Sequence, residues 1–386
     1  MLKRVFFVCL VTMLSASAAF SAITWTPTSA LPAGTKDGAL IAYNGYVYLF
    51  GGRSAANDVA VSTAFYAPIN TDGSLGAWQS TTALPEARAL PGAYAYNGRV
   101  YVWGGWRADW TTMRTGFYAS INPDGSLGSW TTSASLIPQS GGVDQMDSFG
   151  RGILGLGKYV YIIGGEMNDA SLTNKCYYSE IQGSGDFGTW NETTSLPVPT
   201  NGTLKGYWFH GVGIVQGTTS SYIYVVGGNH GGTSESHILS NTINADGSLG
   251  TSWTESSTPL LHALYEHGCA VQGNVIYAVG GLNGSTPQTY VQAITVDPTT
   301  GTVQGVVDET ALAEGRARTH AVCYSAGGKD ILLNAGGAVY SGAPYYDTCF
   351  YSDITIPTAT PTETDTPVPP TPTLSSGVNY DVNRYE

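Results

Sequence analysis

The chain has 386 residues, of which 50 are glycine and 25 are tyrosine, and only 11% are charged. Lysine and arginine number 16 against 28 aspartate and glutamate residues, so the formal net charge is −12. This composition favours an all-β chain with many tight turns. Because the chain is acidic and has no basic cluster, nucleic acid and anionic membrane surfaces are not expected as partners.

Residues 1–21 have the pattern of a secretory signal peptide. Lys3 and Arg4 form a positive end, and the apolar core that follows ends at Leu14. This core is about half as long as the roughly 20 residues that a bilayer-spanning helix needs. The sequence therefore predicts cleavage near residues 18–22, no membrane insertion, and a protein that is secreted or associated with the cell surface.

A short apolar run that ends in two glycines recurs along the chain. Its first copy runs from Tyr46 to Gly52 and follows Asn44-Gly45, a pair typical of a two-residue hairpin turn. The second glycines of the copies are Gly52, Gly105, Gly165, Gly228, Gly281 and Gly337. A period of about 50 to 60 residues with four strand-like runs indicates the blades of a propeller.

Each repeat contains four predicted strands, which we name a to d from the axis outward. Strand a is a short apolar run such as 39–43, strand b ends at the paired glycines, and strand d begins at a tryptophan such as Trp78. The last repeat has a strand c at 348–353 but no strand d, whereas a strand d that begins at Trp25 precedes the first repeat. We therefore expect an all-β, six-bladed propeller over residues 22–356, with four-stranded blades and with the N-terminal strand, anchored by Trp25, completing the last blade.

The apolar strand with its two glycines resembles the kelch repeat, and the copies cover nearly all of residues 23–356. The resemblance is to kelch-repeat propellers of the secreted bacterial type, and it implies a monomeric propeller. Such propellers include copper radical oxidases, whose set of tyrosine, cysteine and histidine ligands cannot be placed here, and a six-bladed periplasmic sialic acid mutarotase. The resemblance therefore implies the fold, and no cofactor is expected.

A second phrase lies between strands c and d of three repeats, at 70–78, 122–130 and 244–253. It contains an asparagine followed by aspartate, glycine and serine, and it resembles the Asp box of sialidases. One interpretation is a calcium loop, because these side chains supply oxygen ligands. The other, which we favour because the phrase recurs around the ring, is a structural turn closed by the aspartate. No metal site is therefore assigned.

Propeller geometry places the a–b and c–d turns on one face, the turn face, and the d–a and b–c loops on the other, the loop face. The turns repeat themselves along this sequence, whereas the loops differ from blade to blade. A single asymmetric ligand is therefore expected on the loop face. Aromatic rings beside charged and amide groups suit a sugar, whose C–H faces stack on rings while its hydroxyls form hydrogen bonds.

The predicted ligand-binding residues are Trp106, Arg107, Asp109, Trp110, Asp147, His210, His230, His267 and His320. The two tryptophans are expected to be exposed, because their loop is otherwise polar. His210, His267 and His320 have equivalent positions just before or in strand a, and a structural role is the alternative for them. A shared zinc ion is not expected, because a ring of six blades spreads equivalent positions widely.

An enzyme is the alternative to a binding protein. A mutarotase-like reaction needs an acid–base carboxylate near the axis and an arginine that holds the substrate's carboxylate. Glu166 and Glu266 are the candidate carboxylates, and Arg151 and Arg318 are the candidate arginines. The sequence contains no glycine-rich phosphate loop and no serine nucleophile elbow.

Four cysteines follow the signal peptide, namely Cys176, Cys269, Cys323 and Cys349. A bridge between Cys269 and Cys323 is conceivable, because they lie in the first strands of neighbouring repeats. The interpretation that we favour is that all four are small buried side chains.

The C-terminal part of the chain has a different composition. Residues 357–373 are rich in proline and threonine, which predicts an extended linker. Residues 374–386 form a short tail, either part of a further module or a spacer at a surface. A tethered propeller suits binding better than free catalysis. We therefore expect a secreted propeller that binds a glycan, a cell-surface glycoconjugate or an extracellular protein, and a sialic acid mutarotase-like epimerase is the alternative.

Overall fold

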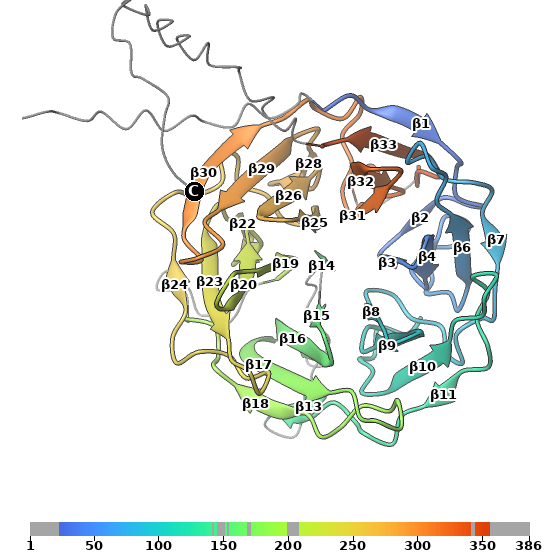
Figure 1. Ribbon diagram of the computed structural model, residues 1–386, viewed down its shortest axis with the longest axis horizontal. Coiled ribbons are helices and arrows are strands. Elements are labelled where there is room, and N and C mark those ends of the chain that lie inside the picture. The colour runs from blue at the N-terminus through green and yellow to red at the C-terminus, as the bar shows by residue number, and fades with distance from the viewer. Residues whose placement is uncertain are drawn as a thin grey trace, which may run out of the picture.

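The computed structural model describes residues 23–140, 143–144, 151–152, 154–167, 171–198, 208–340 and 344–355. The larger sheets are arranged as a ring around a central axis (Figure 1). Six of these sheets are blades, in which a, b, c and d strands follow one another from the axis outward. The prediction of an all-β, six-bladed propeller is confirmed.

The strands of each kind occupy equivalent places in the blades. The a strands are β3 (Ala39–Tyr43), β8 (Gly92–Tyr96), β15 (Gly155–Leu156), β19 (Gly211–Gln216), β25 (Gly268–Gln272) and β31 (His320–Ala326). The b strands are β4 (Tyr46–Phe50), β9 (Arg99–Trp103), β16 (Tyr159–Glu166), β20 (Ser221–Val226), β26 (Val275–Val279) and β32 (Lys329–Ala335). The c strands are β6 (Ala64–Pro68), β10 (Gly116–Ser120), β17 (Leu172–Glu180), β23 (Ile238–Ile243), β29 (Val291–Val296) and β33 (Cys349–Asp353). The d strands are β7 (Gln79–Ser80), β11 (Thr131–Thr132), β18 (Asn191–Thr193), β24 (Thr254–Glu255), β30 (Val303–Asp308) and β1 (Thr26–Thr28).

The b strands are apolar on both faces because each blade packs against two neighbours. In β4, Val47 and Leu49 belong to the core cluster shared with blade 6, whereas Tyr48 and Phe50 belong to the cluster shared with blade 2. All four side chains are buried. An unbroken apolar run is what a strand covered on both faces requires.

Blade 4 has one strand more than the sequence predicted. The two-residue strand β14 (Arg151–Gly152) lies at its inner edge and runs parallel to β19, with Arg151 opposite Gly211. The chain then forms β15, the short a strand of blade 3. The chain between blades 2 and 3 thus contributes backbone to the centre of the ring before blade 3 begins.

The ring closes where β1 pairs with β33, and Thr28 lies opposite Cys349. The prediction that an N-terminal strand completes the last blade is confirmed. Trp25 is only half-buried, and its indole N–H donates to the carbonyl of Thr310 at 3.0 Å. Ile23 is the more buried anchor, with 2% of its surface exposed, and it packs in the core cluster between blades 5 and 6.

Replacing Ile23 by alanine is expected to lower the free energy of unfolding by about 2–5 kcal/mol, because the change leaves a cavity in that cluster. Trp25→Ala is expected to cost less than a fully buried tryptophan would. Chemical denaturation of both variants measures the difference, with Thr26→Ala in the exposed part of β1 as the matched control. Equal stability of the Ile23 and Thr26 variants would contradict this role of Ile23.

The tryptophans at the d strands fasten neighbouring blades together. The indole N–H groups of Trp78, Trp130 and Trp253 donate to the carbonyls of Ser29, Thr82 and Thr194, at 3.0, 2.8 and 3.0 Å. Each acceptor lies in or just after the d strand of the preceding blade. Trp25 makes the same contact with blade 5, so the repeated tryptophan serves the assembly of the ring.

The repeated aspartate phrases are turns on the turn face. The carboxylates of Asp72, Asp124 and Asp246 each accept the backbone N–H of the serine two residues later at 3.0 Å and its hydroxyl at 2.6 Å. The leucine that follows each serine is buried. These aspartates are thus used inside their own turns, as the turn interpretation predicts.

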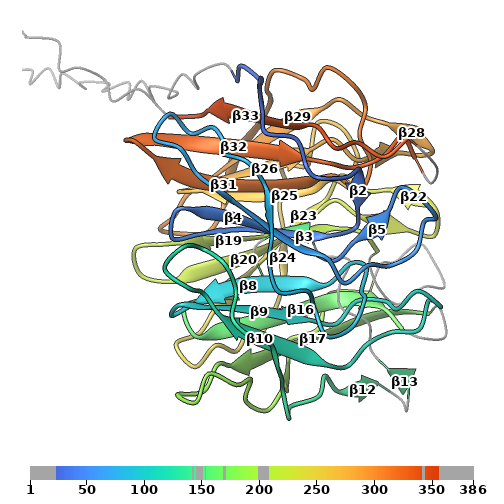
Figure 2. The same cartoon turned by 90° about the vertical axis from the view of Figure 1, so that its right-hand side faces the viewer.

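The loop face carries additional short strands that the turn face lacks among the described residues. They are β2 (Thr35–Lys36), β5 (Arg53–Ser54), β12 (Gln139–Ser140), β13 (Val143–Asp144), β21 (Asn229–His230), β22 (Thr233–Ser234), β27 (Leu282–Asn283) and β28 (Thr286–Pro287). Figure 2 shows β2, β5, β12, β13, β22 and β28 on one side of the ring. The paired glycines make this turn out of strand b possible, since Gly51 and Gly52 have φ angles of 59° and 98°.

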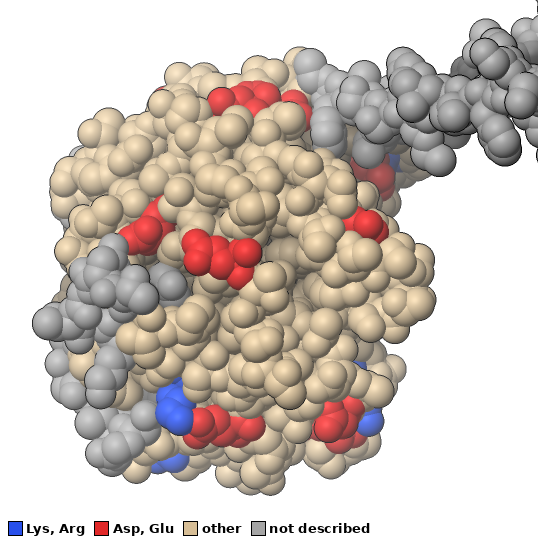
Figure 3. All heavy atoms as spheres, turned by 90° about the vertical axis from the view of Figure 1, so that its left-hand side faces the viewer, with Lys and Arg blue, Asp and Glu red and all other residues tan. Residues whose placement is uncertain are grey.

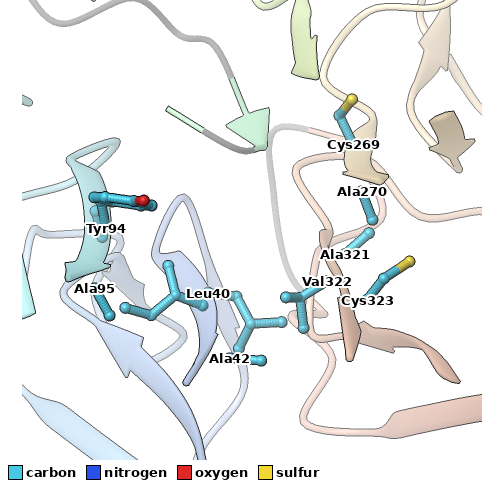
Figure 4. Close-up of a pocket in the computed structure, with 11 residues that line it drawn as sticks. Leu40, Ala42, Tyr94, Ala95, Cys269, Ala270, Ala321, Val322 and Cys323 are labelled. Carbon is cyan, nitrogen blue, oxygen red and sulfur yellow. The ribbon is translucent and has the colours of Figure 1, made fainter. Parts of the chain in front are cut away.

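The centre of the ring is a narrow apolar channel of about 140 Å³. Figure 4 shows side chains of the a strands around it, including Leu40, Ala270 and Ala321. Cys269 and Cys323 also line it, and all four described cysteines are free thiols. Burial raises the pKa of Cys269 to about 12, so this thiol is protonated and acts as a small apolar side chain.

The outer wall of the ring has few charges. Figure 3 shows the left-hand side of Figure 1, where carboxylates lie in small separate groups with few lysine or arginine side chains. No helix in the described ranges has the length and hydropathy that a membrane crossing requires.

Candidate functional site on the loop face

Five residues surround the axis on the loop face, and we call them the entry residues. They are Asp37, Leu90, Phe209, Glu266 and Arg318, with φ angles of 62°, 54°, 53°, 56° and 54°. Each lies two residues before the a strand of its blade. The equivalent position of blade 3 is outside the described residues. A non-glycine residue in this left-handed conformation costs roughly 1–3 kcal/mol, and such strain is concentrated at functional sites.

Backbone hydrogen bonds between blades hold the entry residues in this conformation. The N–H of Glu266 donates to the carbonyl of Phe209 at 3.0 Å, and the N–H of Arg318 donates to that of Glu266 at 2.8 Å. On the other side of the ring, the N–H of Leu90 donates to the carbonyl of Asp37 at 2.6 Å. The ring architecture therefore stabilises a backbone conformation that these side chains would not adopt alone.

Arg318 lies between two carboxylates. Its Nη1 atom is 3.0 Å from Oδ2 of Asp37, and its Nη2 atom is 2.9 Å from Oε1 of Glu266. Burial lowers the pKa of the guanidinium, but Asp37 and Glu266 raise it by more, so the net shift is upward and Arg318 stays charged. This is a charge-assisted network in a poorly solvated place, where such pairs interact strongly.

The network continues into blade 1. Oδ2 of Asp37 is 3.6 Å from Nε of Arg53, and the carboxylate of Asp58 is 3.2 Å from Nζ of Lys36 and 3.8 Å from Arg53. Burial is the largest influence on the pKa values of Arg53 and Lys36 and lowers both. Three cations and three anions thus lie together, and their formal charges cancel.

An apolar cluster fills the axis beside this network. Leu90 and Trp106 from blade 2 pack against Phe209 from blade 4, and the partly buried Trp208 and Tyr265 pack on them. The guanidinium of Arg318 lies 5.1 Å from the centre of the Phe209 ring. The prediction that Trp106 is exposed is wrong, because this packing leaves it only 5% exposed.

A pocket of about 430 Å³ opens between blades 4, 5 and 6, next to the apolar cluster. Its described lining combines four aromatic side chains with one ion pair and one amide. The lining residues are Trp208, Phe209, Asn229, Gly231, Gly232, Tyr265, Glu266, Leu282, Gly284, Ser285, Arg318 and Tyr340. Arg318 also presents an Nε–H group that has no hydrogen-bond partner among the described residues. The pocket thus offers rings for stacking and polar groups that can accept and donate hydrogen bonds.

Trp110 forms an exposed platform on the same face. Its side chain is 54% exposed, its φ angle is 68°, and the guanidinium of Arg53 lies 3.7 Å from the centre of its ring. Trp106 contacts it edge-on, at 5.0 Å between ring centres. The prediction that Trp110 is exposed is confirmed. Because Arg53 also contacts Asp37, the platform is joined to the pocket through the ion network.

Glu166 lies at the end of β16, directly after the paired glycines of blade 3. One carboxylate oxygen, Oε2, has no hydrogen-bond partner among the described residues. Burial raises the pKa of this carboxyl from 4.5 to about 7. A carboxyl that holds its proton near neutral pH has the property that acid–base chemistry requires.

The pH dependence of stability tests the raised pKa of Glu166. Between pH 4.5 and 7 the folded protein keeps a proton that the unfolded chain has lost, so the contribution of Glu166 to stability falls as pH rises through this range. Glu166→Gln removes this dependence and is expected to flatten the melting temperature between pH 4.5 and 7. Parallel pH profiles of the two proteins would contradict the raised pKa.

The predicted histidines lie inside the protein. His210, His230, His267 and His320 are all buried. His320 accepts the backbone N–H of Gly38 in the neighbouring blade at 2.8 Å through Nε2. These positions are those of the structural alternative, so the site is built below from other residues.

The remaining predicted residues are dispersed. Arg107 is exposed and lies 3.6 Å from Glu86, and the carboxylate of Asp109 accepts the hydroxyl and N–H of Thr111 within its own turn. For Arg151 the structure describes only the backbone, in β14. Asp147 lies outside the described residues. Of the predicted residues, the structure brings Glu266 and Arg318 together and places Trp110 on the same face.

Sequence reasoning did not select several residues of this site. Asp37, Arg53, Phe209 and Tyr340 were not candidates, although Tyr340 lines the pocket with 41% of its surface exposed. A usable signal was position, because each entry residue lies two residues before a predicted strand a. Large apolar side chains are a second signal, since six of the seven exposed ones in the described ranges lie in loops of this face, namely Trp110, Leu136, Val198, Leu261, Val339 and Tyr340.

Comparison with known proteins agrees with the architecture. The Kelch motif family model matches residues 263–297, which include β25 to β29 of blade 5. A solved structure described as the structure of YjhT is similar with a TM-score of 0.60 and 14% sequence identity, and the match covers 83% of this chain and 95% of that chain. No curated protein matches the sequence. The chain is therefore a six-bladed β-propeller that carries a kelch motif and shares the fold of YjhT.

Proposed function

We propose that this propeller binds a saccharide on its loop face, in the pocket between blades 4, 5 and 6. The observation that carries the proposal is the lining of the pocket. Trp208, Tyr265 and Tyr340 supply rings on which the C–H faces of a sugar stack, and Glu266 with Arg318 supplies planar hydrogen-bonding groups for its hydroxyls. A few polar groups in an otherwise aromatic concavity are typical of small-ligand sites.

Three further features support a binding role on this face. The entry residues are strained and held by the ring, so the site is organised before a ligand arrives. The exposed apolar side chains gather in the loops around it. The predicted signal peptide and the proline- and threonine-rich linker suit a propeller that works outside the cell, so the proposed ligand is an extracellular or cell-surface glycan.

A glycan-array screen of the purified protein tests this proposal. We expect binding to a restricted set of glycans, and we expect Tyr340→Ala to weaken it, because this change removes an exposed ring from the pocket without opening the core. Val307→Ala, on the outer strand β30, is the matched control. Binding that both variants retain would place the ligand elsewhere. No glycan binding, together with capture of an extracellular protein that Tyr340→Ala abolishes, would replace the saccharide by a protein partner.

An enzyme acting on carbohydrate is the second candidate, and Glu166 is the observation that favours it. Its carboxyl has a pKa of about 7, near the operating pH of a general acid or base. If the propeller is an enzyme, a glycan found on the array is converted by the wild-type protein and not by Glu166→Gln. Binding without conversion by either protein would leave the binding role alone.

A further inference from the structure

The charged groups of the pocket are already paired with one another. Among the described lining residues, Glu266 and Arg318 carry the charges at neutral pH, and they are 2.9 Å apart. Asp37 contacts the same guanidinium from behind at 3.0 Å. The group of three therefore has one positive and two negative charges, and Arg53 balances the second carboxylate outside the pocket.

This pairing leaves Arg318 little capacity for an anion. A guanidinium binds a carboxylate best through two parallel N–H groups. Both Nη atoms of Arg318 already contact protein carboxylates, and Nε–H is the group without a partner among the described residues. A single donor suits one neutral acceptor oxygen better than a charged carboxylate.

An acidic ligand would also meet like charges. A carboxylate placed against Nε–H of Arg318 would lie near the negative groups of Glu266 and Asp37, both of which are almost fully buried. Like charges close together in a poorly solvated site repel strongly. A hydroxyl instead accepts from Nε–H and donates to the Glu266 carboxylate, so it uses both groups without adding charge.

We propose that the pocket selects uncharged saccharides and rejects those that carry a carboxylate or a sulfate. This inference rests on the proposed saccharide-binding function. It disagrees with the expectation that Arg318 holds the carboxylate of an acidic sugar, which a sialic acid mutarotase-like reaction requires.

The test uses two sugars that differ only in one acidic group, methyl glucoside and methyl glucuronoside. Calorimetric titration of the wild-type protein is expected to show at least roughly tenfold weaker binding of the glucuronoside. Glu266→Gln removes one negative charge from the pocket wall and is expected to strengthen glucuronoside binding by roughly tenfold or more. Glu314→Gln is the matched control, because Glu314 pairs with Arg316 at 2.6 Å, and neither residue lines the pocket.

The outcomes separate this inference from the proposed function. Tighter binding of the glucuronoside than of the glucoside by the wild-type protein would overturn the selectivity while leaving saccharide binding intact. If the wild-type protein binds neither sugar, the proposed function fails for these sugars, and acetate then probes the charge argument alone. A gain of acetate binding by Glu266→Gln supports it, and no gain overturns it. If Glu266→Gln does not fold, the wild-type ranking of the two sugars decides.

Discussion

Replacing Arg318 by methionine is expected to lower the free energy of unfolding by about 3–5 kcal/mol. The change removes the cation between Asp37 and Glu266 and leaves two buried carboxylates with less compensation. Breaking a buried ion pair from one side costs more than the pair itself contributes, because the remaining charge stays desolvated. Urea denaturation of the wild-type and variant proteins measures the loss.

Two controls distinguish this effect from a general loss of an arginine. The double variant Arg318→Met with Glu266→Gln is expected to recover part of the lost stability, because it also removes a stranded charge. Arg107→Met, which removes an exposed arginine 3.6 Å from Glu86, is expected to cost less than about 1 kcal/mol. If the Arg318 and Arg107 variants were equally stable, the buried network would not have the role described here.

Replacing Trp110 by alanine is expected to weaken saccharide binding by about tenfold while leaving the melting temperature nearly unchanged. The side chain is 54% exposed, and one face of its ring rests on Arg53, so its loss removes a stacking surface and little core. The double replacement of Trp106 and Trp110 would be a poorer test, because Trp106 is buried against Leu90 and Phe209. Titration with the best glycan of the array provides the measurement.

Trp110→Phe is the informative companion, because it keeps a ring over Arg53 and should retain part of the affinity. An unchanged affinity of Trp110→Ala would show that the ligand lies wholly within the pocket and does not reach the platform.

The repeated parts of the fold could be predicted because their causes are local in sequence. The paired glycines after each strand b adopt φ angles that other residues rarely adopt, so they mark the same turn in each repeat. The strand d without a repeat before it, at the N-terminus, has a partner only in the last blade, and β1 pairs there with β33. The tryptophans recur because each one joins its blade to the preceding one.

The site could be predicted only in part because its contacts are remote in sequence. Asp37 and Arg318 are 281 positions apart and meet only when the ring closes. The entry residues share a backbone conformation but include an acid, a base, an aliphatic residue and an aromatic one, so no motif in residue type marks them. Trp106 lies in a polar loop, yet packing against residues of two other loops buries it.

The histidines show the opposite error of reasoning from residue type. His210, His267 and His320 were selected because histidine is common in functional sites and because they stand near the loop face. In the structure they are buried at the start of the a strands, and His320 accepts a backbone N–H from the neighbouring blade. Their equivalent positions in the repeats were the better guide to their role than their chemistry.

A crystal structure of the protein with its best array glycan tests the central claim most directly. We expect the sugar in the pocket between blades 4, 5 and 6, with a ring of Tyr265 or Tyr340 against one sugar face and a hydroxyl at Nε of Arg318. The turn face offers an alternative hollow of about 640 Å³, formed by residues 156–159, 217–221 and 242–245. A glycan bound there, with the loop-face pocket empty, would contradict the assignment of the functional face.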